Sequence, residues 1–246
     1  MTPERTEKLL RRFRRAIRQQ WLRAISAVDA SQDARVAAER FADLVIRQAI
    51  LAGYAEAGHL KGVFDPTSSA GRFRAERAGI VSRFLVDAQR VRGGFSSGLS
   101  ARQLRDLRAY AATLEAATLG AIDFGERPTF QSAESRRMLR RVERAMVQQR
   151  ADLIARTQAT AALHLGLEVA VEQTETVGMG RIVRRWVTAS DEKVRSSHAT
   201  LNGQIKFFNE PFISGNGYQL MRPGDPNAPI QETANCRCML ITETAS

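Results

Sequence analysis

Hydrophobic residues recur at helical spacing through most of the first 175 positions of the chain. Near the N-terminus they follow one another at steps of three and four, as expected for the buried face of an amphipathic helix: Leu10, Phe13, Ile17, Trp21 and Ile25. Comparable patterns and helix-start signals predict further helices over residues 31–58, 71–91, 100–120 and 132–172. The last pattern fits either one long helix or two helices that meet near residue 150.

The pattern changes after about residue 175, where turn-forming residues become frequent. Residues 182–187 and 238–241 are rich in strand-forming side chains, and residues 191–200 predict a short helix between them. The sequence therefore predicts an α+β fold. We expect an elongated, arginine-rich helical region over residues 1–175 and a compact mixed α/β domain with short strands over residues 176–246.

Charge adds a second feature to the helical region. The 246-residue chain has a formal net charge of +11, and most of its basic residues lie in the first 150 positions. Such an excess favours an acidic partner, either nucleic acid or an acidic protein surface, with a membrane surface as the less favoured alternative. The densest group lies on the first predicted helix, and its members are candidates for DNA or protein contact: Arg11, Arg12, Arg14, Arg15 and Arg18. The alternative is that they form the solvated face of an ordinary bundle helix.

Composition excludes several classes of protein. A content of 43% hydrophobic and 26% charged residues argues against a wholly disordered chain. No apolar run reaches the roughly 20 residues that a membrane helix needs, and the N-terminus lacks a signal-peptide pattern. We therefore expect synthesis in the cytoplasm and no membrane contact. Two cysteines cannot form a disulfide-rich scaffold.

The C-terminal domain contains an ordered series of motifs. They are a tryptophan and an aspartate, Val-Arg-x-x-His, Gly-Gln, Pro-Gly-Asp and a closing Asn-Cys-Arg-Cys: Trp186, Asp191, Arg195, His198, Gly203, Gln204, Pro223, Gly224, Asp225, Asn235, Cys236, Arg237 and Cys238. The pair Arg156 and Thr157 lies upstream on the last predicted helix. In this order the motifs resemble the phage Mu F-like family, the minor head or head-morphogenesis proteins of tailed phages. The resemblance covers residues 130–242.

The resemblance implies a minor capsid protein of a virion. Such a protein is made in the host cytoplasm and is expected in the capsid interior near the portal vertex. The implied partners are the portal protein, the major capsid or scaffold protein, and packaged double-stranded DNA bound without sequence preference. The implied roles are head assembly, DNA packaging or DNA release, and none of them is enzymatic.

Two alternatives remain open from the residues alone. One is a nonspecific nucleic-acid-binding protein, which the charge supports, although aromatic residues do not interleave with the basic clusters as base stacking would require. The other is a toxin-like or nuclease enzyme that uses His198 with Cys236 or Cys238. We expect no enzyme, because the chain has no nucleotide-binding glycine loop, no Gly-x-Ser-x-Gly elbow and no His-Glu-x-x-His.

The same domain offers candidate metal ligands. Asp191, His198, Cys236 and Cys238 would supply a tetrahedral zinc site if the short helix meets the last strand. Cysteines two positions apart in an extended segment point to the same side. The competing interpretation is that both cysteines are reduced and packed while His198 bonds to Asp191. The Cys-x-Cys spacing is shorter than is usual in zinc sites and favours this second interpretation.

The other motif residues have structural interpretations. Arg195 and Arg237 are expected to pair with nearby carboxylates, the candidates being Asp191, Asp225 and Glu232. Trp186 is expected in the core, and Gly203 in a tight turn that needs a positive φ. Asn235 is expected to cap a turn before the cysteines.

Overall fold

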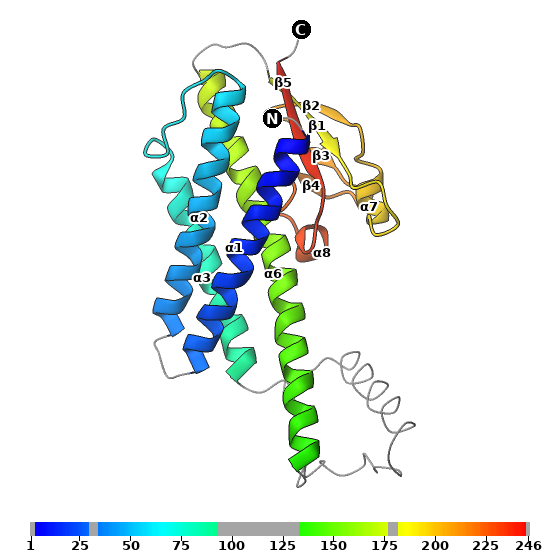
Figure 1. Ribbon diagram of the computed structural model, residues 1–246. Helices are drawn as coiled ribbons and strands as arrows, with labels where there is room; N and C mark the ends of the chain where they lie inside the picture. The colour runs from blue at the N-terminus through cyan, green and yellow to red at the C-terminus, as the bar shows by residue number, and fades with distance from the viewer. Residues whose placement is uncertain (1–2, 30–33, 93–132, 177–181, 245–246) are drawn as a thin grey trace.

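The computed structural model describes residues 3–29, 34–92, 133–176 and 182–244, and everything stated below applies to these residues. Four long helices come first, and short strands and helices follow. The helices are α1 (Pro3–Asp29), α2 (Ala34–His59), α3 (Ala70–Arg92) and α6 (Ala133–Thr176). They pack side by side, and the first turns of α6 extend beyond the other three (Figure 1). The helix expected over residues 100–120 lies outside the described residues.

The large apolar residues of α1 form its buried face as predicted. All five members of the predicted stripe, Leu10, Phe13, Ile17, Trp21 and Ile25, are at most 4% exposed. The long C-terminal pattern forms a single helix, because α6 runs without a break from Ala133 to Thr176. The predicted boundaries of α2 and α3 agree with the structure to within a few residues.

The face of α2 that packs on α6 consists mainly of small residues. Val36 is one of the larger apolar residues of this helix, yet it is 42% exposed. The buried positions of α2 are largely alanines, and α6 presents alanines and Gly166 in return. A Cβ atom at Gly166 would lie 1.9 Å from the carbonyl oxygen of Ala49. Small side chains therefore allow the backbones of α2 and α6 to approach closely.

The C-terminal region forms two small antiparallel sheets beside α6 (Figure 1). In the larger sheet β1 (Ile182–Val187) lies between β2 (Ile205–Phe207) and β5 (Met239–Thr244). The smaller sheet pairs β3 (Phe212–Ile213) with β4 (Gln219–Leu220). Two one-turn helices, α7 (Ser196–Ala199) and α8 (Ile230–Thr233), complete the region. The expected α+β fold is confirmed.

The pairing of β1 with β5 determines where the site forms. Val187, the last residue of β1, lies opposite Met239, the first residue of β5. The segment that follows β1 and the segment that precedes β5 therefore lie at the same end of the sheet. The segment after β1 leads to α7 and His198, while the segment before β5 contains Cys236 and Cys238. The sheet thus brings together residues that are about 40 positions apart.

The short helix differs from its predicted extent. Residues 191–200 were expected to be helical, but α7 begins only at Ser196. An Asp191 carboxylate oxygen accepts a hydrogen bond from the backbone N–H of Lys193 at 3.0 Å, which closes a local turn in place of a first helical turn. Asp191, Arg195 and His198 therefore do not share one helix face.

Hydropathy along the described helices agrees with the composition. None of them combines the length and the apolar character needed to cross a membrane.

We expect Gly166→Ala to destabilise the protein by about 2 kcal/mol or more, because the added Cβ would collide with the backbone of α2. Gly58→Ala is the matched control on α2, since a Cβ there meets nothing within 4 Å. The control should be neutral or stabilising by up to about 1 kcal/mol. Chemical unfolding of the full chain measures both values. Wild-type stability of Gly166→Ala would contradict the close approach of the two helices.

Candidate metal centre

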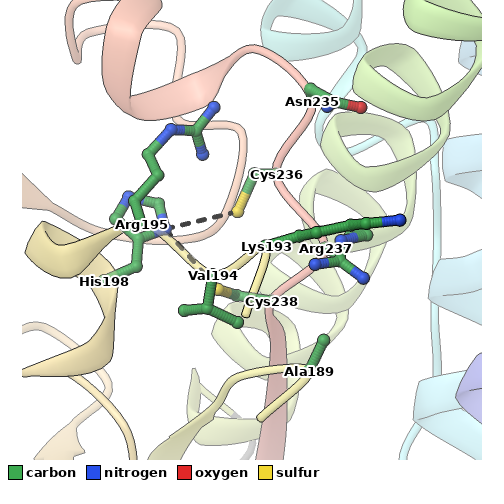
Figure 2. Close-up of a pocket in the computed structure, with 9 residues that line it drawn as sticks. All are labelled: Ala189, Lys193, Val194, Arg195, His198, Asn235, Cys236, Arg237 and Cys238. Carbon is green, nitrogen blue, oxygen red and sulfur yellow. Dashed lines mark hydrogen bonds between the residues drawn. The ribbon is translucent and has the colours of Figure 1, made fainter. Parts of the chain in front are cut away.

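His198 lies at the centre of a buried group that includes both cysteines. Its side chain is 2% exposed, and its Nδ1 atom lies 3.6 Å from the Sγ atom of Cys236 and 3.5 Å from the Sγ atom of Cys238. Figure 2 shows both sulfurs directed at the same edge of the imidazole ring. The three ligand atoms all lie within 4.8 Å of one another.

These distances fit the edges of a metal coordination shell. Bond lengths of about 2.3 Å to sulfur and about 2.0 Å to nitrogen, in tetrahedral directions, place the two ligand atoms roughly 3.6 Å apart. The two N···S distances agree with that value. A hollow of about 10 Å³, lined by all three residues, lies at this point. The group could therefore hold a metal ion.

Glu232 lies behind His198, on the side away from the sulfurs. Its Oε2 atom is 2.9 Å from Nε2 of His198. The angle at Nε2 does not meet the geometry of a hydrogen bond, so the two groups are in close contact without one. Ser197 donates a hydrogen bond to Oε2 at 3.1 Å, and Asn216 donates one to Oε1 at 2.8 Å. The carboxylate is 1% exposed. Metal-binding histidines commonly have a carboxylate at the second ring nitrogen, which fixes the tautomer and the ring orientation.

The two cysteines titrate as a pair. Both are free thiols in the structure. The pKa of Cys236 is lowered well below its ordinary value, chiefly by a hydrogen bond with Cys238 and further by His198, while burial opposes the shift. The pKa of Cys238 is raised by the same hydrogen bond and by burial. The pair therefore favours a thiolate on Cys236, and the thiolate is the form that binds metal.

Asp191 lies outside the group of potential ligands. Its two carboxylate oxygens accept hydrogen bonds from the two terminal nitrogens of Arg237, each at 2.5 Å, and its side chain is 42% exposed. This pairing with Arg237 also lowers the pKa of Asp191. Of the four ligands expected from the sequence, three come together among the described residues, and Asp191 is not one of them. The alternative hydrogen bond between His198 and Asp191 is also not seen among the described residues.

The segment that contains the cysteines also joins the C-terminal region to α6. Asn235 accepts a hydrogen bond from Arg156 at 2.7 Å, and its backbone N–H donates to Thr157 at 2.9 Å. One turn further along α6, the buried Thr160 donates to the carbonyl oxygen of Cys236 at 3.1 Å. The upstream Arg-Thr pair therefore holds the closing Asn-Cys motif against the long helix.

The remaining motif residues support this arrangement. Trp186 is fully buried, with its ring edge-on to His198 at 5.7 Å between centroids. Gly203 has a φ of 80° and Gly224 a φ of 74°, which glycine adopts without strain. Arg195 donates to the carbonyl oxygen of Ala234. Gln204 donates a side-chain hydrogen bond to the carbonyl oxygen of Thr200. The turn that contains Pro223 is held by Asp225, whose carboxylate accepts from two backbone N–H groups and whose own N–H donates to Arg222.

Comparison with protein families identifies the chain. The profile described as Phage Mu protein F like protein matches residues 112–241, which is more than half of the sequence. The chain belongs to the phage Mu F-like family. No curated protein and no solved structure matches it. The Mu F-like proteins are phage head morphogenesis proteins, a structural rather than a typically enzymatic family.

The arginines on α1 of this Mu F-like protein have different environments. Arg11, Arg12 and Arg15 are exposed, and Arg11 pairs with Glu7 at 3.1 Å. Arg18 is bound to Asp152 and Gln148 of α6. Arg14 is half-buried, which lowers its pKa, and the charges of Arg156 and Arg237 act in the same direction.

A basic face, interrupted by Gln19, remains on α1 after these pairings. We call it the basic stripe, and it consists of Lys8, Arg12, Arg15 and Arg23. They are separated by four, three and eight residues in turn, which places them on one side of the helix. No member of the stripe forms an ion pair with another residue in the part of the chain that the structure describes.

The sequence did not indicate the part that three residues play in the centre. Glu232 was expected beside Arg195 or Arg237 but lies against His198, and Thr160 lies among the alanines of α6. His164 also lies on α6, buried beside Cys238, and burial lowers its pKa to about 3, so its ring is neutral. Their roles depend on contacts across the seam between α6 and the C-terminal region, which spacing along the chain does not reveal.

We expect Thr160→Val to destabilise the full chain by about 1–3 kcal/mol, because the carbonyl oxygen of Cys236 would lose its buried partner. Thr244→Val is the control, since Thr244 is exposed at the end of β5. Chemical unfolding compares the two variants. Equal stability of both would show that the bond from Thr160 contributes nothing to the seam.

Proposed function

We propose that this Mu F-like protein is a minor capsid protein that associates with the portal from inside the phage head and assists head assembly, DNA packaging or DNA release. The observation that carries the proposal is the family match over residues 112–241, together with the shared motifs that form the seam between α6 and the closing Asn-Cys-Arg-Cys. A scaffold or major capsid protein would be its neighbour during assembly, and packaged double-stranded DNA its neighbour afterwards.

The basic stripe supports a polyanionic partner. Lys8, Arg12, Arg15 and Arg23 present positive charge along one helix face, and none of them forms an ion pair with another residue that the structure describes. Arginine forms bidentate pairs with carboxylates as well as with phosphates, so the stripe suits an acidic portal surface and packaged DNA alike. Contacts of this kind with DNA are independent of sequence and weaken as salt rises. The nonspecific nucleic-acid-binding alternative rests on the same stripe.

We further propose that His198, Cys236 and Cys238 bind a structural zinc ion. The N···S distances and the buried carboxylate behind His198 support zinc. The ion would connect α7 to the segment that precedes β5, and through Thr160 it would strengthen the attachment of the C-terminal region to α6. An enzymatic role for the same group is less well supported, because both sulfurs are buried and the hollow beside them, about 10 Å³, has room for nothing larger than a water molecule or a small ion.

The portal protein of the same phage should retain this chain in a pull-down at low and moderate salt, with or without nuclease treatment. The triple variant Lys8→Gln, Arg12→Gln, Arg15→Gln should bind about tenfold more weakly, as expected for the loss of three exposed ion pairs of about 0.5 kcal/mol each. Absence of binding by the wild type in every condition would overturn the portal proposal.

The control carries the same loss of charge elsewhere. Arg35→Gln, Arg40→Gln, Arg47→Gln removes three exposed arginines from α2 and should bind the portal like the wild type. Equal weakening of both triple variants would show that net charge acts rather than the stripe. Binding that disappears after nuclease treatment would support the nucleic-acid alternative instead.

Protein purified without chelators should contain about one zinc ion per chain by elemental analysis. A chelator should lower its melting temperature by roughly 4–8 °C, the shift that corresponds to about 2 kcal/mol. The double variant Cys236→Ser, Cys238→Ser should lack zinc and should not respond to the chelator. His59→Ala, which changes an exposed histidine, is the control. Zinc-free protein with a melting temperature insensitive to chelator would overturn the zinc site.

A further inference from the structure

The candidate centre offers three ligands, whereas zinc in a structural site usually has four from the protein. Other polar groups around it already have partners. Asp191 is held by Arg237, Asn235 by Arg156, and the carboxylate of Glu232 lies on the far side of the His198 ring. Within the described ranges, no further histidine, cysteine, aspartate or glutamate joins the group. The fourth coordination position therefore has no such ligand from the described part of the chain, and the hollow lies beside the three that are present.

The hollow has a positively charged lining. Lys193, Arg195 and Arg237 are among the residues that line it with the three ligand residues, although the charged ends of Lys193 and Arg237 point away from the sulfurs (Figure 2). Only Arg237 has a carboxylate partner among the described residues, because Arg195 is bound to a backbone carbonyl oxygen. A divalent ion with two thiolates and a neutral imidazole has no net charge. The surplus positive charge at the rim therefore favours an anion at the fourth position.

We propose that the metal centre has an open fourth position that takes an exchangeable small anion, with Glu232 as the residue that positions His198. The inference rests on the zinc site proposed above and adds to it the coordination number and the class of external ligand. Glu232 acts through the ring: contact of its Oε2 atom with Nε2 directs Nδ1 toward the metal. Ser197 and Asn216 hold the carboxylate in place.

Cobalt(II) substitution tests the open position. Full-length protein stripped with a chelator is titrated with Co²⁺, and azide is then added as the anionic probe. Tetrahedral cobalt–thiolate absorption should appear on addition of metal, and azide should shift the visible bands in a saturable way. The variant Asp191→Asn should give the same spectrum and the same azide response as the wild type, because Asp191 is not a ligand.

The outcomes separate the inference from the zinc proposal. In one outcome, azide leaves the cobalt–thiolate bands of the wild type unchanged but shifts those of Asp191→Asn. That result would show that Asp191 is the fourth ligand and would overturn the open position. Bands that ignore azide in both proteins would show a site closed by another residue, which also overturns it while zinc binding stands. Absence of cobalt–thiolate bands would overturn both proposals.

A second variant tests Glu232 as a positioning residue. Glu232→Gln should weaken metal affinity about 10–100-fold in competition with a chromophoric chelator, while the cobalt bands at saturation keep their thiolate character. Glu192→Gln, which changes an exposed acid near the site, should keep wild-type affinity. Circular dichroism confirms that each variant is folded. Wild-type metal affinity in a folded Glu232→Gln protein would contradict the positioning role.

Discussion

The buried imidazole of His198 is the point on which the C-terminal region depends. A ring that is 2% exposed needs polar partners near both nitrogens, since burial without them is costly. Cys236 and Cys238 meet Nδ1, and Glu232 meets Nε2. All three partners lie within one stretch of chain just before β5. The histidine therefore holds the closing segment in place, and the segment in turn fixes the ring.

The same closing segment connects the site to the helical bundle. Asn235 and Cys236 bond to successive turns of α6 through Arg156, Thr157 and Thr160. The two halves of the family motif, the Arg-Thr pair and the Asn-Cys-Arg-Cys, thus form one interface although they are nearly 80 positions apart. On this account these residues seat a small domain on a long helix. The basic stripe of α1 takes no part in this interface, and its members form no ion pair with another residue that the structure describes.

Much of this architecture could be predicted from the sequence where the physical signal is strong. Large apolar residues at helical spacing predicted α1 correctly, and the rare residue types His and Cys indicated the centre. The small-residue packing face of α2 gives little signal, because alanine has low hydropathy although it allows close helix approach. Asp191 was assigned as a ligand because the helix was extended to it, whereas its side chain closes a turn. Glu232 was expected beside Arg195 or Arg237, because only the folded chain brings it to His198.

The most direct test of the account is X-ray absorption at the zinc edge of the purified full-length protein. The account predicts two sulfur neighbours at about 2.3 Å and one imidazole nitrogen at about 2.0 Å, with one further light atom from outside the chain. That result would place the metal between His198, Cys236 and Cys238. A shell of oxygen and nitrogen alone, with no sulfur, would show that any bound zinc lies elsewhere and would contradict the metal centre.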